Sequence, residues 1–465
     1  MKHTQAYIVS LFCSCILLVA CFFLASCKKW VSVPPPANQV ISATVFNDDA
    51  SATAAITGIY SEMMSNSNQF CSGQTTVLAG LAADELSLVG TGFQQEFESN
   101  DITQTSHGVI SSYFWDRPYK YIYTANLCIE GLNNVSSLTP SLKKTLLGEA
   151  KFIRAFSYFY LVNLFGDVPL ITSTAYSQNA SLPRSPLNDV YALIISDLKE
   201  AQSLLPAAYV AAEKIRPNKW AATALLARVL LYNKDFTGAE KEASAVINSN
   251  AYSLVPNLNN VFVKGSAETI WQLYPVNTIW NTWEGRNFLP SSASAAPQYR
   301  ITPSLLGAFQ TADGRRSSWV ASKTLPAGTF IHPFKYKIYG NGAPQTEYYV
   351  VLRLAEQYLI RAEARAQLNN ITGAQSDLNT VRTRAGLPNT PANDQPSLLD
   401  AIEAERRIEL MFEWGHRWFD LKRTGRVNTV MAALKPATWQ PTDSLWPIPA
   451  GQLAANPFLT QNPGY

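Results

Sequence analysis

Apolar side chains recur along most of the chain at the three- and four-residue spacing of amphipathic helices. This spacing predicts a mainly α-helical protein, because half-buried strands would instead alternate apolar and polar positions. Gly166 is expected to end the helical segment Ser141–Phe165, and Pro169 is expected to prevent the helix from resuming. The helical segments expected from this pattern are Asp48–Met64, Tyr113–Leu138, Ser141–Phe165, Leu187–Leu205 and Asn218–Asn248, the last divided into a pair at Asn233–Asp235.

Part of the helical pattern occurs twice, which predicts helical hairpins of the tetratricopeptide type. Phe236–Ala239 follows Ala227 at the same distance at which Ile371–Ala374 follows Ala362. Small residues at such positions let the two helices of a hairpin pack closely, so Ala227 and Ala239 are expected to be buried. One hairpin cannot bury its apolar face alone, and further hairpins are therefore expected among the earlier helices.

Between the two repeats the pattern becomes irregular. Residues 256–345 are rich in Asn, Ser, Pro and Gly, with short strand-like runs at Thr269–Leu273 and Phe334–Tyr339. A similar polar stretch covers Ser65–Ile110. Long irregular segments on a rigid scaffold are where binding residues usually lie. We therefore expect a tetratricopeptide-like scaffold with a loop-rich insertion and a few short strands.

The N-terminus has the pattern of an export signal that ends at a cysteine. A charged start precedes a long apolar stretch, and the run Leu24–Cys27 closes it with two small residues and a thiol. This run resembles a bacterial lipobox, in which the thiol of Cys27 carries lipid and becomes the mature N-terminus. An ordinary cleaved signal is the alternative. The three prolines Pro34–Pro36 that follow predict an extended tether.

These patterns divide the chain into five segments with different expected roles. They are a signal peptide (1–26), a lipid-anchored tether (27–45), an N-terminal helical part (46–250), an irregular insertion that holds the candidate ligand face (251–345) and a C-terminal part (346–465).

Composition narrows the possible ligands. Charged residues make up 15% of the chain and the net charge is +3, so neither nucleic acid nor an acidic polymer is implied. Aromatic residues make up 11%, including 11 Trp and 21 Tyr, which favours contact with a neutral, ring-shaped ligand, although a large core accounts for most of them. Outside the signal and Cys27 only Cys71 and Cys128 remain, and the sequence leaves open whether they form a disulfide.

Signatures of enzymes are missing from the sequence. The histidines beyond the signal, His107, His332 and His416, lack the spacing of zinc ligands, and there is no nucleophile elbow or phosphate-binding loop. Two acidic pairs in polar stretches, Asp84 with Glu85 and Glu96 with Glu98, are interpreted as solvated loop charges rather than as a glycosidase dyad. The sequence therefore predicts neither catalysis nor a bound cofactor. It identifies no metal ligand and leaves open whether a structural metal ion is bound.

Charged motifs near the C-terminus are interpreted as structural. Glu405, Glu409 and Glu413 lie four residues apart, which predicts an ion-pair network rather than a catalytic site. Their expected partners are Arg406, Arg407 and Arg417. Arg154, among aromatic residues of the third helical segment, is expected to stack on them or to form a pair beneath them.

Several motifs are specific in type and order. They are Glu149–Phe159, Leu164–Leu170, Glu405–Leu410, Glu413–Gly425, Leu445–Pro449, Asn456-Pro457 and the chain end Gln461–Tyr465. Together these motifs resemble the SusD/RagB-like family of nutrient-binding, glycan-binding lipoproteins of the outer membrane, and the resemblance spans nearly the whole mature chain. It implies a helical fold with four tetratricopeptide-like hairpins.

The resemblance also implies a function and a partner. Members bind oligosaccharide at the cell surface and deliver it to a SusC-like TonB-dependent transporter in the outer membrane. Peptide capture is the main rival function, since some members resemble partners in peptide uptake. Two more functions stay open at this point: a surface glycoside hydrolase, and a structural lid without ligand affinity of its own.

Sugar binding needs flat apolar faces for the pyranose ring and planar polar groups for its hydroxyls. The segment Asn277–Phe288 has this mixture, with the candidate residues Trp280, Trp283, Asn277, Asn281 and Arg286. A second candidate is Thr91–Phe97, through Phe93 and Phe97. The alternative role for Trp280 and Trp283 is to pin the insertion to the helices. The tryptophans expected to serve packing alone are Trp115, Trp220, Trp418 and Trp446.

Overall fold

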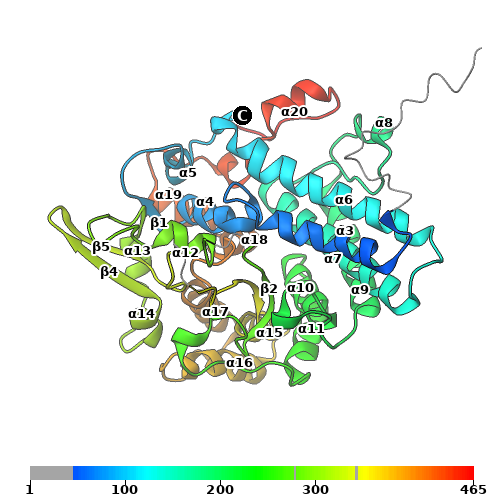
Figure 1. The fold of residues 1–465 in the computed structure, drawn as a ribbon. Coiled ribbons are helices and arrows are strands. Elements are labelled where there is room, and N and C mark those ends of the chain that lie inside the picture. Colours follow the sequence, from blue (N-terminus) through cyan, green and yellow to red (C-terminus); the bar gives the residue numbers. More distant parts are fainter. Residues whose placement is uncertain (1–44, 277–278, 341–343) are drawn as a thin grey trace, which may run out of the picture. The chain divides into compact units, whose positions relative to one another are not determined.

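A computed structural model describes residues 45–276, 279–340 and 344–465, and within them the chain is mainly helical (Figure 1). The helices before the insertion are α3 (Asp49–Met63), α4 (Thr75–Ala82), α5 (Gln94–Ser99), α6 (Asp116–Asn133), α7 (Pro140–Phe165), α8 (Tyr176–Asn179), α9 (Leu187–Leu204), α10 (Lys219–Tyr232) and α11 (Phe236–Asn248). The later helices are α12 (Trp283–Phe288), α13 (Pro303–Leu306), α14 (Gly314–Ser318), α15 (Leu354–Gln367), α16 (Ile371–Arg384), α17 (Gln395–Glu409), α18 (His416–Arg423), α19 (Val427–Leu434) and α20 (Ala450–Ala455).

The long helices agree closely with the sequence prediction. Each of the five expected segments corresponds to one or two of the helices α3, α6, α7, α9, α10 and α11, and α7 begins one residue before its expected start. Gly166 ends α7 with φ of 73°, a left-handed conformation that favours glycine, as expected for a helix stop. Arg154 forms a bidentate pair with Asp197 of α9, with both nitrogen–oxygen distances at 2.7 Å, and donates to Asn126 of α6. It thereby ties α7 to both neighbouring helices.

The two predicted hairpins are present as α10–α11 and α15–α16. Asp235 and Asn370 cap the second helix of each hairpin in the same way, by accepting the amide of the residue three positions later at 2.8 and 3.0 Å. Ala227 and Ala239 are fully buried, as expected. Helices α11 and α15 pack against each other, so the two hairpins are neighbours, as Figure 1 shows in its lower half.

Among the residues that the structure describes, three two-stranded antiparallel sheets interrupt the helices. They pair β1 (Leu86–Leu88) with β3 (Tyr299–Ile301), β2 (Thr269–Leu273) with β6 (Tyr349–Arg353), and β4 (Val320–Leu325) with β5 (Gly328–Pro333). The β2–β6 pair aligns Thr269 with Arg353 and fastens the start of the insertion to the strand that leads into α15. The strand expected at Thr269–Leu273 is thus confirmed.

The strand expected at Phe334–Tyr339 is wrong, because β5 ends at Pro333 and no strand follows it in the described residues before β6. Polar side chains take the place of a neighbouring strand here. The amides of Lys337 and Ile338 donate to the carboxylate of Glu347 at 2.8 and 3.1 Å. The ammonium of Lys335 turns inward and donates to the carbonyl of Glu409 at 2.8 Å. The segment therefore lies outside the three described sheets.

The polar stretch Ser65–Ile110 is less irregular than its composition indicates. It contains α4, all eight residues of which are buried, and β1 and α5. Of the two acidic pairs within it, Asp84 with Glu85 is buried rather than solvated, which corrects the sequence interpretation of that pair. Asp84 binds Arg417 at 2.8 Å and Arg407 at 2.5 Å, and Glu85 is 1% exposed.

The ion-pair network predicted for the C-terminal glutamates exists, but its cations come from other segments. Glu405 pairs with Arg315 at 2.6 Å and Arg382 at 3.1 Å. The carboxylate of Glu409 contacts Arg315, Arg353 and Arg384, and that of Glu413 contacts Lys335 and Arg353. The expected partners bind elsewhere, since Arg406 pairs with Asp420 while Arg407 and Arg417 pair with Asp84.

This network is buried, and its arginines shift the pKa of the glutamates that they contact. Burial by itself would raise the pKa of the Glu409 carboxyl, but Arg384, Arg353 and Arg315 together hold it below its usual range. The network joins α17 to β6, α14 and α16, which lie far apart in the sequence. It therefore fixes the core against which the insertion packs.

Three further features complete the fold. Cys71 and Cys128 are buried free thiols, so they form no disulfide with each other. In the described part of the chain, no helix is both long enough and apolar enough to cross a bilayer. Residues Phe46–Tyr465 form one compact unit, and the expected divisions at residues 250 and 345 stay predictions. Cys27 and the whole expected signal and tether up to residue 44 lie outside the described residues.

Candidate functional site

Two segments of the insertion cross each other at the candidate site. Helix α12 passes beneath residues 338–340, and glycines at both contacts make the crossing possible. A Cβ atom on Gly285 would lie 2.3 Å from the carbonyl oxygen of Ile338. A Cβ atom on Gly340, which has φ of 113°, would lie 2.4 Å from the Trp280 ring. Because neither position has room for a side chain, glycine is what allows the two segments to approach this closely.

This crossing brings three aromatic rings and a guanidinium together. The Arg286 guanidinium lies 4.8 Å from the centre of the Trp280 ring and 4.8 Å from that of Tyr339. The two rings meet edge to face at 5.6 Å, and Trp283 lies 6.4 Å from Trp280. All four side chains are half-buried. We call Trp280, Trp283, Arg286 and Tyr339 the aromatic platform.

The platform is attached to the scaffold on its inner side. Thr282 caps α12 by accepting the amide of Gly285 at 3.0 Å, which orients the helix start. The indole nitrogen of Trp283 lies 3.5 Å from the carbonyl oxygen of Met64, at the end of α3. Trp283 therefore has part of the pinning role that the sequence left as an alternative, while its half-buried ring remains part of the platform.

The structure separates the remaining candidates from the platform. Asn281 is fully buried, accepts the amides of Thr346 and Glu347 at 2.7 and 2.9 Å, and donates to Pro344 at 3.2 Å. The expectation that Asn281 contacts ligand is therefore wrong, because its side chain is enclosed and bonded inside the protein. Asn277 lies outside the described residues.

The second candidate segment is mostly core. Phe97 is fully buried on α5 and packs edge to face on Trp446 at 5.2 Å, so its ring is not accessible to a ligand. Phe93 is half-buried and contacts Phe97 and the partly exposed His107 at 6.5 and 6.3 Å. Phe93 alone keeps an accessible ring there, and this part of the prediction is corrected accordingly.

Tyr339 is the platform residue that sequence patterns did not identify. It ends the run that was expected to form a strand, where alternating aromatic residues are usually a packing signal. Tyr274, which is not part of the platform, is a second accessible aromatic residue that the sequence did not identify. It is 41% exposed just after β2, and its ring centre lies 5.2 Å from that of Tyr348. A proline follows Tyr274 and ends the strand there. This proline was the sequence signal that could have indicated an exposed ring.

A buried carboxyl lies within α12, behind the platform. Glu284 is fully buried, with Oε1 3.5 Å from the hydroxyl of Thr76, which in turn lies 3.1 Å from that of Tyr349. Its second oxygen has no hydrogen-bond partner among the described residues. Burial raises the pKa of Glu284 to about 8, although hydrogen bonds from Tyr349 and Thr76 oppose the shift. The group is therefore protonated at neutral pH.

Glu284→Gln should remove the loss of folding stability that the wild type shows as pH rises. Between the ordinary carboxyl pKa of 4.5 and the raised value of about 8, the folded chain keeps a proton that the unfolded chain has lost. Stability of the wild type therefore falls as pH rises through this window. The amide variant should unfold near the wild-type temperature at pH 4.5 and roughly 2 °C or more above it at pH 8.

Thermal unfolding followed by circular dichroism across this pH range measures the difference. Glu200→Gln is the matched control, since the Glu200 side chain is 52% exposed and the same substitution should give no such trend. A difference between Glu284→Gln and wild type that is constant with pH would contradict the assignment of a protonated Glu284.

The acidic and histidine side chains of the described residues are not grouped as a metal site. No set of three or more His, Cys, Asp or Glu side chains is placed to hold a metal ion within residues 45–276, 279–340 and 344–465. Glu98, from the second acidic pair, accepts the amide of Leu88 at 3.2 Å, and Glu96 contacts His107 at 3.1 Å. What the platform offers is a stacking and hydrogen-bonding surface.

Comparisons with known proteins identify the family of the chain. Residues 32–231 match the family model described as starch-binding associating with outer membrane, and residues 322–465 match the SusD family model. "SusD-like protein P2" of Formosa agariphila is 29% identical over 92% of this chain and 95% of its own length. A SusD-like protein of Bacteroides ovatus is 24% identical over 87% of this chain and 81% of its own length.

Solved structures agree with this result. A SusD superfamily protein of Bacteroides vulgatus has a TM-score of 0.80 at 21% identity, covering 91% of this chain and all of that one. A structure described as a laminarin binding SusD-like protein has a TM-score of 0.76 at 26% identity, covering 90% of this chain and all of that one. The two family models, the curated relatives and the shared fold lead to one conclusion: the chain belongs to the SusD/RagB-like family of carbohydrate-binding proteins associated with the outer membrane.

Proposed function

We propose that this chain binds an oligosaccharide at the aromatic platform, without cleaving it, and delivers it to a SusC-like TonB-dependent transporter. The observation that supports this most is the pair of rings, Trp280 and Tyr339, with the Arg286 guanidinium 4.8 Å from each. Half-buried aromatic rings offer flat faces to the C–H side of a sugar, and a guanidinium donates to its hydroxyls.

Two comparisons add support for a glycan rather than another nutrient. The match at residues 32–231 is to a starch-binding family model, and a solved structure with 26% identity is named for binding laminarin. Neutral glucans are the ligand class to try first, because the platform combines three rings with a single cation.

A binding screen tests this proposal. The chain from Lys28 onward would be probed against an array of laminarin and starch oligosaccharides, acidic glycans and peptides, and the best ligand would then be incubated and sized. We expect binding of a neutral oligosaccharide whose length stays unchanged. Binding of peptides alone would favour peptide capture, shortening of the ligand would favour a hydrolase, and no binding at all would favour a structural lid.

Attachment to the membrane is a separate part of the proposal and rests on the run Leu24–Cys27. Lipid on Cys27 would hold the protein at the outer membrane, beside its transporter, through acyl chains on one residue. Cys27→Ser should move the protein from the membrane fraction to the soluble fraction, as measured by fractionation and immunoblotting. A variant that stays with the membrane, together with a wild type that takes up no labelled fatty acid, would contradict lipidation.

A further inference from the structure

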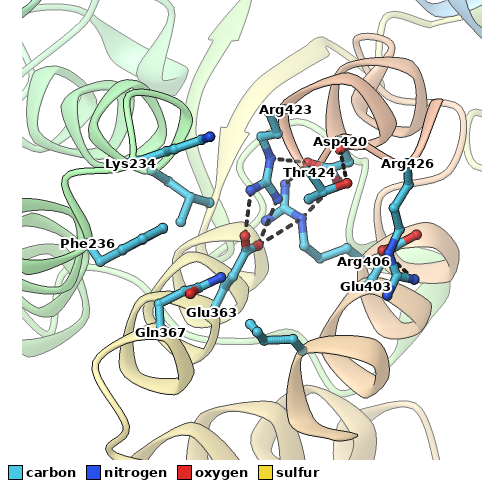
Figure 2. A pocket seen from close by; sticks show the side chains of 12 residues that line it. Lys234, Phe236, Glu363, Gln367, Glu403, Arg406, Asp420, Arg423, Thr424 and Arg426 are labelled. Atoms are coloured by element: carbon cyan, nitrogen blue, oxygen red, sulfur yellow. Dashed lines mark hydrogen bonds and ion pairs between the residues drawn. The ribbon is translucent and has the colours of Figure 1, made fainter. Parts of the chain in front are cut away.

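A charged pocket lies away from the insertion, where the first hairpin faces α15, α17 and α18. Its volume is about 430 Å³, within the range of roughly 300–1,000 Å³ that small-ligand sites occupy. Figure 2 shows its lining side chains converging from both hairpins and from α17 and α18. Four cations and three carboxylates line it: Lys234, Arg406, Arg423, Arg426, Glu363, Glu403 and Asp420.

Two of the three carboxylates are neutralised by a pair of buried arginines. Arg423 holds Glu363 with two contacts of 2.5 and 2.7 Å and also contacts Asp420 at 2.7 Å. Arg406 holds Asp420 with contacts of 2.8 and 3.1 Å.

The third carboxylate, that of Glu403, is shared by two arginines. Arg426 contacts it at 2.9 Å and Arg417, behind the lining, at 3.1 Å. None of the acids therefore has a charge left for an incoming cation.

The charged groups left without a partner in the lining are donors. The Lys234 ammonium has no hydrogen-bond or ion-pair partner in the described part of the chain, and its residue is exposed. Arg406 is 2% exposed, and its Nη1 has no hydrogen-bond partner among the described residues. In Figure 2 the Arg406 guanidinium reaches the middle of the lining, between Glu363 and Asp420. A pocket whose carboxylates are all paired and whose unused charged groups are donors suits a ligand that is negatively charged and accepts hydrogen bonds.

The backbone conformation at Lys234 is a further argument that this lysine has a role at the pocket. Lys234 has φ of 60°, a left-handed conformation that is uncommon for residues with side chains, other than asparagine and aspartate. In the second hairpin the equivalent position, seven residues after the repeated alanine, is Asn369 with φ of 61°. The first hairpin thus has a lysine where the fold favours an asparagine, and it places that lysine at the pocket.

We propose that this pocket binds an oxyanion, the carboxylate or sulfate group of a small acidic ligand, between Lys234 and Arg406. The half-buried ring of Phe236 adds an apolar part to the lining, on the same side as Lys234 in Figure 2. Such a ligand would complete the charge balance of the lining. The site is distinct from the aromatic platform and does not depend on the oligosaccharide function.

Calorimetric titration at low ionic strength tests the proposal with three probes: sodium D-glucuronate, sodium sulfate and D-glucose as the neutral control. We expect one of the two anions to bind with 1:1 stoichiometry and D-glucose not to bind. Saturation by glucuronate assigns a carboxylate ligand, and saturation by sulfate assigns a sulfate ester. Added sodium chloride should weaken binding, because the attraction at this exposed pocket is screened.

Lys234→Asn is the variant of choice, because asparagine suits the left-handed backbone and the fold should be unaffected. It should weaken anion binding about tenfold, the loss typical of one charge-assisted hydrogen bond. Lys241→Asn removes the same charge from the exposed face of α11, outside the lining, and should bind like the wild type. The proposal is overturned if neither anion binds, if D-glucose binds equally well, or if the two variants behave alike.

Discussion

Arg353→Met is expected to destabilise the fold by about 3–5 kcal/mol, the usual cost of removing one partner from a buried ion-pair network. Arg353 is 2% exposed and contacts the carboxylates of Glu268, Glu409 and Glu413 at 2.6–2.8 Å, as well as the carbonyl of Glu409 at 2.6 Å. Methionine fills a similar volume but leaves these carboxylates with fewer cations in a buried site.

Urea unfolding monitored by circular dichroism measures this loss. Arg426→Met is the matched control, because the Arg426 side chain is 46% exposed and its pairs with Asp400 and Glu403 are near the surface. Exposed pairs of this kind contribute at most about 1 kcal/mol. Equal unfolding midpoints for the two variants would show that the network around Arg353 does not hold the core together.

The helical scaffold could be predicted from the sequence because its signals are local. The apolar spacing of α7 and the glycine at position 166 lie within one element, and the two hairpins share small residues and caps at fixed distances. Such patterns need no knowledge of distant neighbours. The strand expected at Phe334–Tyr339 failed for the opposite reason, since Glu347, outside the run, takes the amides that a neighbouring strand would have bonded.

Ion-pair partners were predicted poorly because charge pairing in this fold is long-range. Arg406 and Arg407 follow Glu405 directly in the sequence, yet one pairs with Asp420 and the other with Asp84, 323 residues away. Helical periodicity gives the face on which a charge lies but not the element packed against that face. The existence of the network was therefore predictable, but the partners of each charged residue were not.

The candidate site was predictable in part. The composition of Asn277–Phe288 identified Trp280, Trp283 and Arg286, which the structure brings together. Composition could not tell that Asn281 faces inward to bond Thr346 and Glu347, because these partners lie 65 and 66 residues ahead. Tyr339 joins the platform through the same long-range crossing, which depends on glycines whose role only the folded geometry reveals.

Trp280→Ala is expected to weaken oligosaccharide binding by about 2 kcal/mol or more, roughly 30-fold in affinity, as for a binding hot spot. Trp280 is the centre of the platform, in contact with Trp283, Tyr339 and Arg286. Its removal deletes a stacking face and also releases Arg286 from one of its two rings. The fold should survive, since the ring is half-buried and belongs to a surface segment rather than to the core.

Tyr176→Ala provides the matched control for the loss of an aromatic ring. Tyr176 lies on α8 with 82% of its surface exposed and belongs to no part of the platform. The substitution should leave both the fold and the oligosaccharide affinity unchanged. Circular dichroism of both variants separates loss of binding from loss of folding.

Calorimetric titration of the wild type, Trp280→Ala and Tyr176→Ala with the best oligosaccharide from the binding screen tests the central claim most directly. We predict wild-type affinity for Tyr176→Ala and an affinity at least roughly 30-fold lower for a folded Trp280→Ala. Wild-type affinity in folded Trp280→Ala would contradict the claim that the aromatic platform is where this protein binds sugar.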